Sequence, residues 1–311
     1  MGEQKDTKRL RALIRRLKFN DYVFSLIGLV CMMVGVVTLL GLFTNLLLDG
    51  LERLNYDFFT SFPSRRAAQA GILSAWVGSV LVLLVTAVVA VPMGVAAAVY
   101  LEEYAPKNLL TSIIEINVSN LAGVPSIIYG LLALGLFVYQ LDLGQSILTA
   151  GLTLALLILP IVIVATRESL RTIPREIREA AYALGTTRWQ MIRDHVLPYS
   201  RGGILTGVII GMSRAIGETA PIITIGALTF IAFLPPAPFT GEAGEPLAGM
   251  FDWLFSPFTV LPIQMFNWVS RPEEAFLVNA AATGVVIITM TLTMNALAIY
   301  LRYKIRKNIK W

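Results

Sequence analysis

Stretches of apolar residues, each more than 20 positions long, alternate along the chain with shorter polar segments. A helix of about 20 apolar residues crosses the ~30 Å hydrocarbon core of a bilayer. The pattern therefore predicts an all-α polytopic membrane protein with six transmembrane helices, some tilted or kinked because they exceed the required length. The predicted spans are residues 22–48, 71–100, 110–139, 145–166, 202–233 and 276–301.

Four prolines lie inside these predicted spans: Pro92, Pro125, Pro160 and Pro221. A proline removes one backbone donor from a helix, but in a membrane the neighbouring helices can satisfy the carbonyl that is freed. We therefore expect the spans to continue through their prolines.

The composition agrees with a membrane protein. Only 14% of the 311 residues are charged, 56% are hydrophobic, and the mean hydropathy is +0.71. A soluble domain carries about 25% charged residues, so little chain is left for one. The first apolar stretch is too long for a secretory signal and lacks a cleavage site, so we expect an uncleaved span. Its Cys31 is the only cysteine, which excludes disulfides and thiolate metal clusters.

The basic residues predict the orientation of the chain. Twenty of the 25 lysines and arginines lie in residues 1–21, 101–112, 167–201 and 302–311, on one side of the predicted membrane, and the segments on the other side carry four. Cytoplasmic segments are enriched in lysine and arginine. Both termini and segment 167–201 are therefore expected in the cytoplasm. Topology then explains the net charge of +5, and we expect no nucleic-acid partner.

The polar segment 167–201 contains the sequence REAAYALGTTRWQMIRDHVLP. Gly185 can supply the left-handed conformation that ends a helix. Thr187 and Gln190 have the spacing of a capping box, so a second short helix is expected to begin there, and Pro198 to end it. The pattern predicts a helix, a glycine turn and a second helix that project from the membrane.

Such a hairpin is either a simple linker or a docking element. Glu179, Ala180 and Ala181 place an acid beside two small side chains, which allow close approach of another protein. More arginines surround them than helix capping needs, which favours docking. These are Arg171, Arg175, Arg178, Arg188 and Arg193.

The hairpin resembles the EAA signature of ABC-importer permeases, E-A-A-x3-G-x9-I-x-L-P. His195, the only histidine, departs from the signature because it stands at the isoleucine position. In that family the hairpin is a coupling helix that seats in a cleft of the ATP-binding subunit, and the resemblance implies the same role here. The matching residues are Glu179, Ala180, Ala181, Gly185, Leu197 and Pro198.

The predicted fifth span carries two charges in the run RGGILTGVIIGMSRAIGETAPIITIGA. Arg214 and Glu218 are i, i+4 neighbours on a helix, and Arg214 would lie ~16 Å beyond the start of the span, near the bilayer midplane. The same half of this helix carries a stripe of small residues that favours close helix packing. The stripe consists of Gly203, Gly207, Gly211 and Ala215.

This charge pair is either an ion pair that locks two helices or part of an anion path. A charge at the bilayer centre costs about 2.5–3.5 kcal/mol on insertion scales, so such residues usually have a function. The planar guanidinium of Arg214 matches phosphate oxygens. Glu218 would hold Arg214 when the site is empty. It would also accept a hydrogen bond from a protonated phosphate, which sulfate does not offer near neutral pH.

The run SRAIGETAPIITIGA resembles a segment of phosphate ABC-importer permeases, especially of the PstA type. NLAGVPSIIYGL and AVPMGVAAAVYLEEY resemble two further segments. The resemblance implies the ABC type I importer permease (MetI-like) fold, in the inner membrane of the cell. It also implies a subunit that forms half of a translocation pathway for inorganic phosphate, with Arg214, Glu218 and Thr219 in that pathway.

The resemblance further implies a PstC-type sister permease, two ATP-binding subunits and an extracytoplasmic phosphate-binding protein as partners, besides phosphate and membrane lipid. The chain has no G-x-x-x-x-G-K-[ST] sequence to cradle nucleotide phosphates. We therefore expect a non-catalytic subunit without a cofactor of its own, with ATP and Mg²⁺ bound by the partner ATPase subunits.

The predicted organisation has four parts: a basic cytoplasmic tail (1–21), a first transmembrane helix with its periplasmic loop (22–70), a permease core (71–301) and a second basic tail (302–311). The core includes the coupling hairpin 167–201 and the periplasmic loop 234–275. This loop starts as irregular Pro/Gly-rich chain and continues with aromatic residues typical of short helices at a membrane interface. It is either a membrane-skimming connector or a docking surface for an external partner.

Other functions remain as alternatives. The nearest is a permease for another oxyanion, such as phosphonate or sulfate, and a more distant one is a standalone secondary transporter or channel. No inverted repeat supports the latter. One histidine and one cysteine exclude the common zinc motifs, and no serine has a histidine-based activating arrangement. Glu115 is expected to be a solvated acid near the start of a helix.

Overall fold

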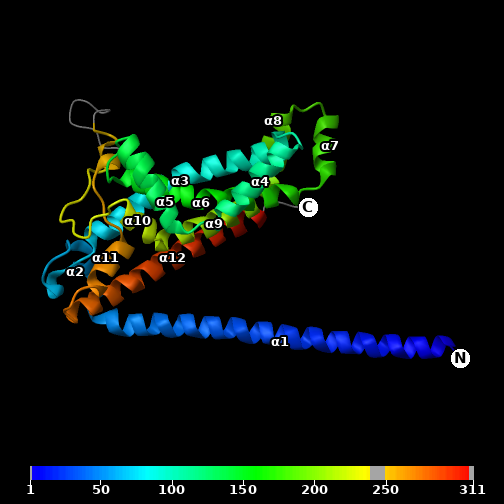
Figure 1. Ribbon diagram of the computed structural model, residues 1–311, viewed down its shortest axis with the longest axis horizontal. Coiled ribbons are helices and arrows are strands. Elements are labelled where there is room, and N and C mark those ends of the chain that lie inside the picture. Colours follow the sequence, from blue (N-terminus) through cyan, green and yellow to red (C-terminus); the bar gives the residue numbers. More distant parts are fainter. Residues whose placement is uncertain (1, 239–248, 308–311) are drawn as a thin grey trace. The chain divides into compact units, whose positions relative to one another are not determined.

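The computed structural model describes residues 2–238 and 249–307 (Figure 1). All regular elements within these ranges are helices, which confirms the predicted all-α class. The chain divides into two compact units, Met1–Asp49 and Gly50–Trp311. Helix α1 (Gly2–Gly50) is continuous, so the predicted basic tail and the first span form a single helix.

The second unit is built around four long helices: α3 (Leu73–Val99), α6 (Ile147–Arg171), α9 (Leu197–Gly217) and α12 (Ala275–Lys307). Helix α3 packs on α6, α6 packs on α9, and α9 packs on α12. The largest apolar core lies between these helices and includes the fully buried Ala90 and Ile158.

The predicted stripe of small residues on α9 is the face that packs on α6. A side chain at Gly203 would collide with Ser169, and one at Gly207 would collide with Ala165. Gly211 lies against Ile158 one turn further on. The stripe therefore lets the backbones of α6 and α9 approach closely, as expected.

Four helices in the described ranges are long and apolar enough to cross a membrane: Leu13–Arg53, Leu73–Tyr104, Ile147–Arg171 and Ala275–Lys304. The predicted span 110–139 is not one continuous helix. Helices α4 (Leu109–Leu121) and α5 (Ser126–Ala133), the latter continued by the π-helical η4 (Leu134–Gln140), meet at an angle of 105°. They form either a broken span or a re-entrant loop.

The predicted span 202–233 is also divided. Helix α9 stops at Gly217, and α10 (Ala220–Thr224) is a separate short helix. No regular element follows α10 among the described residues up to 238. The prediction of six continuous spans is therefore not confirmed, although the all-α membrane architecture is.

A glycine shortly before the proline distinguishes the broken helices from the unbroken ones. Pro92 and Pro160 lie inside the continuous helices α3 and α6. At the α4–α5 break the chain reads GVP, and at the α9–α10 break it reads GETAP. Glycine and proline are the poorest helix formers, so the pair ends a helix where a single proline in an apolar helix does not.

The two breaks bring their short helices against each other. Helix α5 packs on α10, and Gly130 is the point of closest approach. A Cβ atom added there would lie 2.6 Å from the Cα atom of Pro221 and closer still to Oγ1 of Thr224. The two broken segments therefore touch through their backbones.

The short helices η1 (Leu51–Arg53), α2 (Tyr56–Thr60), η2 (Ala67–Gln69) and α11 (Leu261–Val269) belong to the end of the second unit where α12 begins (Figure 1). A second apolar cluster holds this end together. Its aromatic members are Phe58, Trp268 and Phe276.

The aromatic part of the predicted loop 234–275 is only partly buried in the protein. Residues 239–248 lie outside the described residues, and the remainder contains η6 (Asp252–Phe255) and α11. Trp253 and Trp268 are 3% and 0% exposed. Trp253 and Trp268 therefore complete the two apolar cores, whereas Phe251, Phe255 and Phe266 are more than half exposed. The predicted short helices are present, and their place at the membrane interface stays a prediction.

We predict that Gly130→Ala destabilises the purified protein by about 1–3 kcal/mol, because the added methyl group overpacks the contact between α5 and α10. Gly135→Ala is the matched control, since nothing lies within 4 Å of a Cβ at that position. The control should be neutral or slightly stabilising. Thermal unfolding of both variants in detergent measures the difference, and equal melting temperatures would contradict the backbone contact.

Candidate functional site

The polar segment between α6 and α9 forms the predicted hairpin, with helices α7 (Arg175–Ala183) and α8 (Arg188–Met191) (Figure 1). Gly185 has a φ of +79°, and its N–H donates to the carbonyl of Tyr182 at 2.9 Å. The N–H of Thr186 donates to the carbonyl of Ala181 at 3.3 Å. This pair of bonds is a Schellman motif, so the predicted glycine stop is confirmed.

The second helix of the hairpin begins with the predicted capping box but does not end where expected. The backbone N–H of Gln190 donates to Thr187 Oγ1 at 3.3 Å, and that of Thr187 donates to Gln190 Oε1 at 2.9 Å. The prediction that Pro198 ends this helix is wrong. The chain continues through the π-helical η5 (Ile192–Val196) into α9, and this wider turn accommodates a proline that has no N–H to donate.

The six residues predicted to couple to an ATPase differ in exposure. Glu179, Ala180 and Gly185 are exposed on the hairpin. Ala181 is buried at 2%, and it packs in the apolar base of the hairpin. The remaining two, Leu197 and Pro198, are half-buried at the start of α9.

Three large apolar side chains on the same hairpin were missed from the sequence. Tyr182, Leu184 and Trp189 are 46%, 81% and 55% exposed. Their signal was their position, since large apolar residues in a segment outside the membrane are either buried or available to a partner. Together with Glu179 and Ala180 they form an exposed surface, called here the hairpin surface.

The hairpin stands on a fixed base. Arg178 of α7 donates two hydrogen bonds to Glu103 Oε1, at 2.7 and 3.1 Å. It also donates to the carbonyls of Leu170 and Ile173, at 3.0 and 2.8 Å. Glu103 belongs to the π-helical η3 (Tyr100–Tyr104) at the end of α3 and is only 8% exposed. These bonds tie α7 to the ends of α3 and α6.

Two further hairpin arginines also have partners within the chain. Arg188 lies over the ring of Tyr104, 5.1 Å from its centroid. Arg193 donates to Asp194 at 2.7 Å, and this hydrogen bond lowers the pKa of the Asp194 carboxyl below its ordinary value. These contacts account for part of the excess of arginine within the chain itself, and the docking role of the basic surround stays a prediction.

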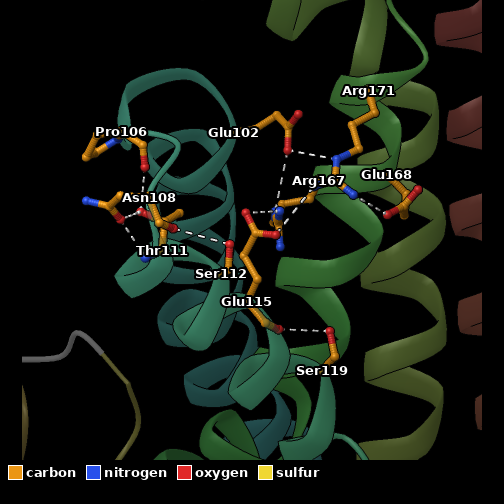
Figure 2. A network of polar contacts seen from close by, with 10 residues as sticks. All are labelled: Glu102, Pro106, Asn108, Thr111, Ser112, Glu115, Ser119, Arg167, Glu168 and Arg171. Carbon is orange, nitrogen blue, oxygen red and sulfur yellow. Dashed lines mark hydrogen bonds and ion pairs between the residues drawn. The ribbon is translucent and has the colours of Figure 1, made fainter.

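Figure 2 shows a network of charges between α6 and two earlier elements, η3 and α4. Arg167 of α6 lies 2.6 Å from Glu115 and 3.6 Å from Glu102, and its side chain is only 6% exposed. Arg171, one turn further along α6, binds Glu102 at 2.9 Å and reaches Glu115 at 3.8 Å. Glu115 is therefore an ion-pair partner, and the prediction that it is a solvated acid is wrong.

The predicted charge pair forms at the end of α9. Arg214 Nε donates to Glu218 Oε1 at 3.1 Å. Contrary to the prediction, Glu218 is not part of the helix. Helix α9 ends at Gly217, and Glu218 has an extended backbone (φ −75°, ψ 121°). The side chain of Arg214 is 35% exposed and that of Glu218 is 16% exposed.

The neighbours of this pair come from both helix breaks. Thr219, the third residue of the predicted site, is half-buried and precedes α10 as its N-cap. Tyr129 of α5 is 7% exposed, lies within range of the charge of Arg214, and donates to the carbonyl of Leu121 at 2.8 Å. This hydrogen bond joins α5 to the last residue of α4, across the break.

This chain encloses little space at the charge pair. The cavity beside Glu218 has a volume of about 10 Å³, roughly that of one water molecule. The side chain of Arg214 is more exposed than that of Glu218. Among residues 2–238 and 249–307, no three histidine, cysteine or acidic residues are grouped so as to hold a metal ion.

Comparisons with known proteins agree with this geometry. The family described as "Binding-protein-dependent transport system inner membrane component" matches residues 90–310. The phosphate transport system permease protein PstA of Yersinia pestis is 32% identical over 302 residues, which cover 94% of this chain and 92% of that protein. The probable ABC transporter permease protein YqgI of Bacillus subtilis is 28% identical, over 86% of this chain and 90% of that protein.

A solved structure shows the same fold. A chain of the MetNI methionine ABC transporter, crystallised in inward-facing conformations, aligns with a TM-score of 0.52 at 16% identity. The alignment covers 73% of this chain and 91% of that chain. The MetI-like fold expected from the sequence is therefore confirmed.

We predict that Gly185→Val destabilises the hairpin by about 1–3 kcal/mol, because a β-branched residue at positive φ is strained. Gly185→Asn is the matched control, since asparagine tolerates this conformation. Limited trypsin digestion after Arg188, in membranes, measures the opening of the hairpin. Faster cleavage is expected for the valine variant, and equal rates for the two variants would count against the strain.

Proposed function

Because the chain belongs to the inner membrane components of binding-protein-dependent transport systems, we propose that it is a transmembrane permease subunit of an ATP-driven importer of inorganic phosphate. The observation that carries this proposal is the Arg214–Glu218 pair, which places a partly exposed guanidinium among apolar helices. The alternative, an ion pair that only locks two helices, fits the exposure of Arg214 less well, since a locking pair is expected to be enclosed.

The exposure of Arg214 supports a pathway that two subunits share. A guanidinium facing hydrocarbon is costly, so arginines in membrane proteins face protein or water. The side chain of Arg214 is 35% exposed, and the cavity beside Glu218 is far too small for phosphate. We therefore place the anion path at the surface of this subunit, where a PstC-type sister permease completes it.

The chemistry of the three predicted residues suits phosphate. Arg214 can donate two parallel hydrogen bonds to an oxyanion, replacing part of its hydration shell. Glu218 holds Arg214 while the path is empty, and its carboxylate can accept a hydrogen bond from the protonated oxygen that phosphate carries and sulfate lacks. The hydroxyl of Thr219 is a further neutral donor beside them.

The choice of phosphate rests on the relatives. Several relatives of about 30% identity over most of the chain are named as PstA phosphate transport permeases. A permease for another oxyanion, such as phosphonate or sulfate, would use the same arginine. The acceptor role of Glu218 favours phosphate over sulfate, and the names of the relatives favour phosphate over phosphonate.

The hairpin surface is the proposed contact with the ATP-binding subunits. In this proposal two ATP-binding subunits bind ATP and Mg²⁺, and this chain supplies no nucleotide site, since it has no P-loop sequence. Leu184 and Trp189 would enter a cleft of the ATPase, with Ala180 allowing close approach and Glu179 adding a charge. An extracytoplasmic phosphate-binding protein would deliver the substrate to the opposite face.

The proposed orientation has both termini and the hairpin in the cytoplasm of a multi-pass inner membrane protein. The excess of lysine and arginine in residues 1–21, 167–201 and 302–311 supports this orientation.

Phosphate uptake tests the function. The complex that copurifies with this chain, in right-side-out vesicles, is expected to take up phosphate with enclosed ATP and with added binding protein, and not with a non-hydrolysable analogue. Glu179→Lys should abolish uptake while membrane insertion is retained, and Glu176→Lys, an exposed acid one turn earlier on α7, is the matched control. Uptake driven by an ion gradient without ATP would instead support a secondary transporter.

We predict separate effects for the two members of the charge pair. Arg214→Lys removes the planar fork and about 1.5–3 kcal/mol of charge-assisted hydrogen bonding, which corresponds to roughly tenfold to hundredfold slower phosphate uptake. Glu218→Gln keeps the size of the side chain but should lose discrimination between phosphate and sulfate. Competition of both anions for uptake is the measurement, and unchanged selectivity in Glu218→Gln would refute the acceptor role.

A further inference from the structure

Three arginines of α6 and α7 bind three acids that come from an earlier part of the chain. Arg178 binds Glu103, Arg167 and Arg171 bind Glu102, and both also reach Glu115. The acids lie on η3 and on α4, so the charges join the base of the hairpin to α4. These six residues are called here the ion-pair strut.

The strut is a main attachment of α4 to the rest of the unit. None of the residues Leu109–Leu121, all of which the structure describes, is buried. Val118 packs partly against Ala98 and Ile163, and Glu115 supplies the charge contacts in the same region of the helix. Helix α4 is therefore held by charge at least as much as by apolar packing.

The strut is not easily opened. Arg167 is almost fully enclosed, and Glu103 is 8% exposed and receives two hydrogen bonds from Arg178. Separating such a pair leaves a charge without a partner in a region of low dielectric constant, which is strongly unfavourable. The six residues are therefore expected to move together.

Helix α4 leads directly to the charge pair. The hydroxyl of Tyr129 on α5 holds the last carbonyl of α4, and Gly130 touches Pro221 just beyond Glu218. A displacement of the hairpin that is carried by the strut to α4 therefore arrives at the α5 side of Arg214, while α9 carries the same displacement along its own axis.

We propose that the ion-pair strut is a transmission element, which keeps α4 and the hairpin moving as one body when the hairpin is pushed. This inference rests on the proposed function and assigns to Glu115 and Arg178 a positioning role in transport. Neither residue contacts the anion. Instead, they make the α5 side and the α9 side of the Arg214 site move together.

The first test neutralises one end of the strut. Glu115→Gln removes the acid of α4, and Glu168→Gln is the matched control, because Glu168 is exposed and, among the residues that the structure describes, forms its ion pair within α6, with Arg171 at 3.3 Å. In the reconstituted complex, Glu115→Gln should leave ATP hydrolysis nearly unchanged while the phosphate moved per ATP falls by roughly tenfold. Glu168→Gln should leave both unchanged, and equal coupling in the two variants would overturn the proposal.

The second test replaces the ion pair by a covalent link. In a Cys31→Ser background, Glu115→Cys with Arg171→Cys should be uncoupled, and joining the two thiols with a short bis-maleimide should restore phosphate movement per ATP. Both sites are accessible, with side chains 31% and 44% exposed. Failure of the link to restore coupling would show that the contact must open during transport, which overturns the strut.

The wild-type complex separates the two hypotheses. Absence of ATP-driven uptake in the wild type counts against the proposed function. Normal wild-type uptake together with fully coupled Glu115→Gln counts against the strut alone.

Discussion

A guanidinium group inside an apolar helix bundle requires a carboxylate beside it, because an unpaired buried charge costs more than a fold of this size can spare. The chain meets this requirement at two arginines. Arg167 is enclosed by acids from η3 and α4, and Arg214 is held by Glu218 at the end of α9. Glu115 lies on α4, which has no buried residue, and Glu218 lies in the short connection between α9 and α10. The charges therefore fix the position of α4 and the course of the chain after α9.

Features that depend on a few neighbouring residues could be predicted from the sequence. The left-handed turn at Gly185, the capping box of Thr187 and Gln190, and the packing stripe beginning at Gly203 all have the predicted geometry. Each is decided by backbone sterics or helical periodicity within one or two turns. The Arg214–Glu218 pair belongs to the same class, since its members are four residues apart, although the helix ends between them.

Features that depend on distant residues could not be predicted in this way. Arg178 looked like part of a docking surface because its partner Glu103 lies 75 positions earlier in the chain. Trp253 and Trp268 have the composition of a membrane interface, and only the packing of α11 and η6 against the long helices shows that they are interior residues. The helix breaks are an intermediate case, because the sequence shows the prolines, whereas the structure shows that a helix breaks where a glycine precedes the proline.

The number of residues in the π-helical turn η5 determines how α9 is rotated about its axis relative to the hairpin. From Arg188 to Gly217 the chain is helical without interruption, so the hairpin and Arg214 lie on one rod. A π turn holds one residue more than an α turn, and each residue rotates the following side chains by about 100° and advances them by about 1.5 Å. The direction in which Arg214 points is thus set by the number of residues in the rod as well as by their identity. Adding or removing one residue would turn the guanidinium onto another face of the helix, even with every side chain of the site intact.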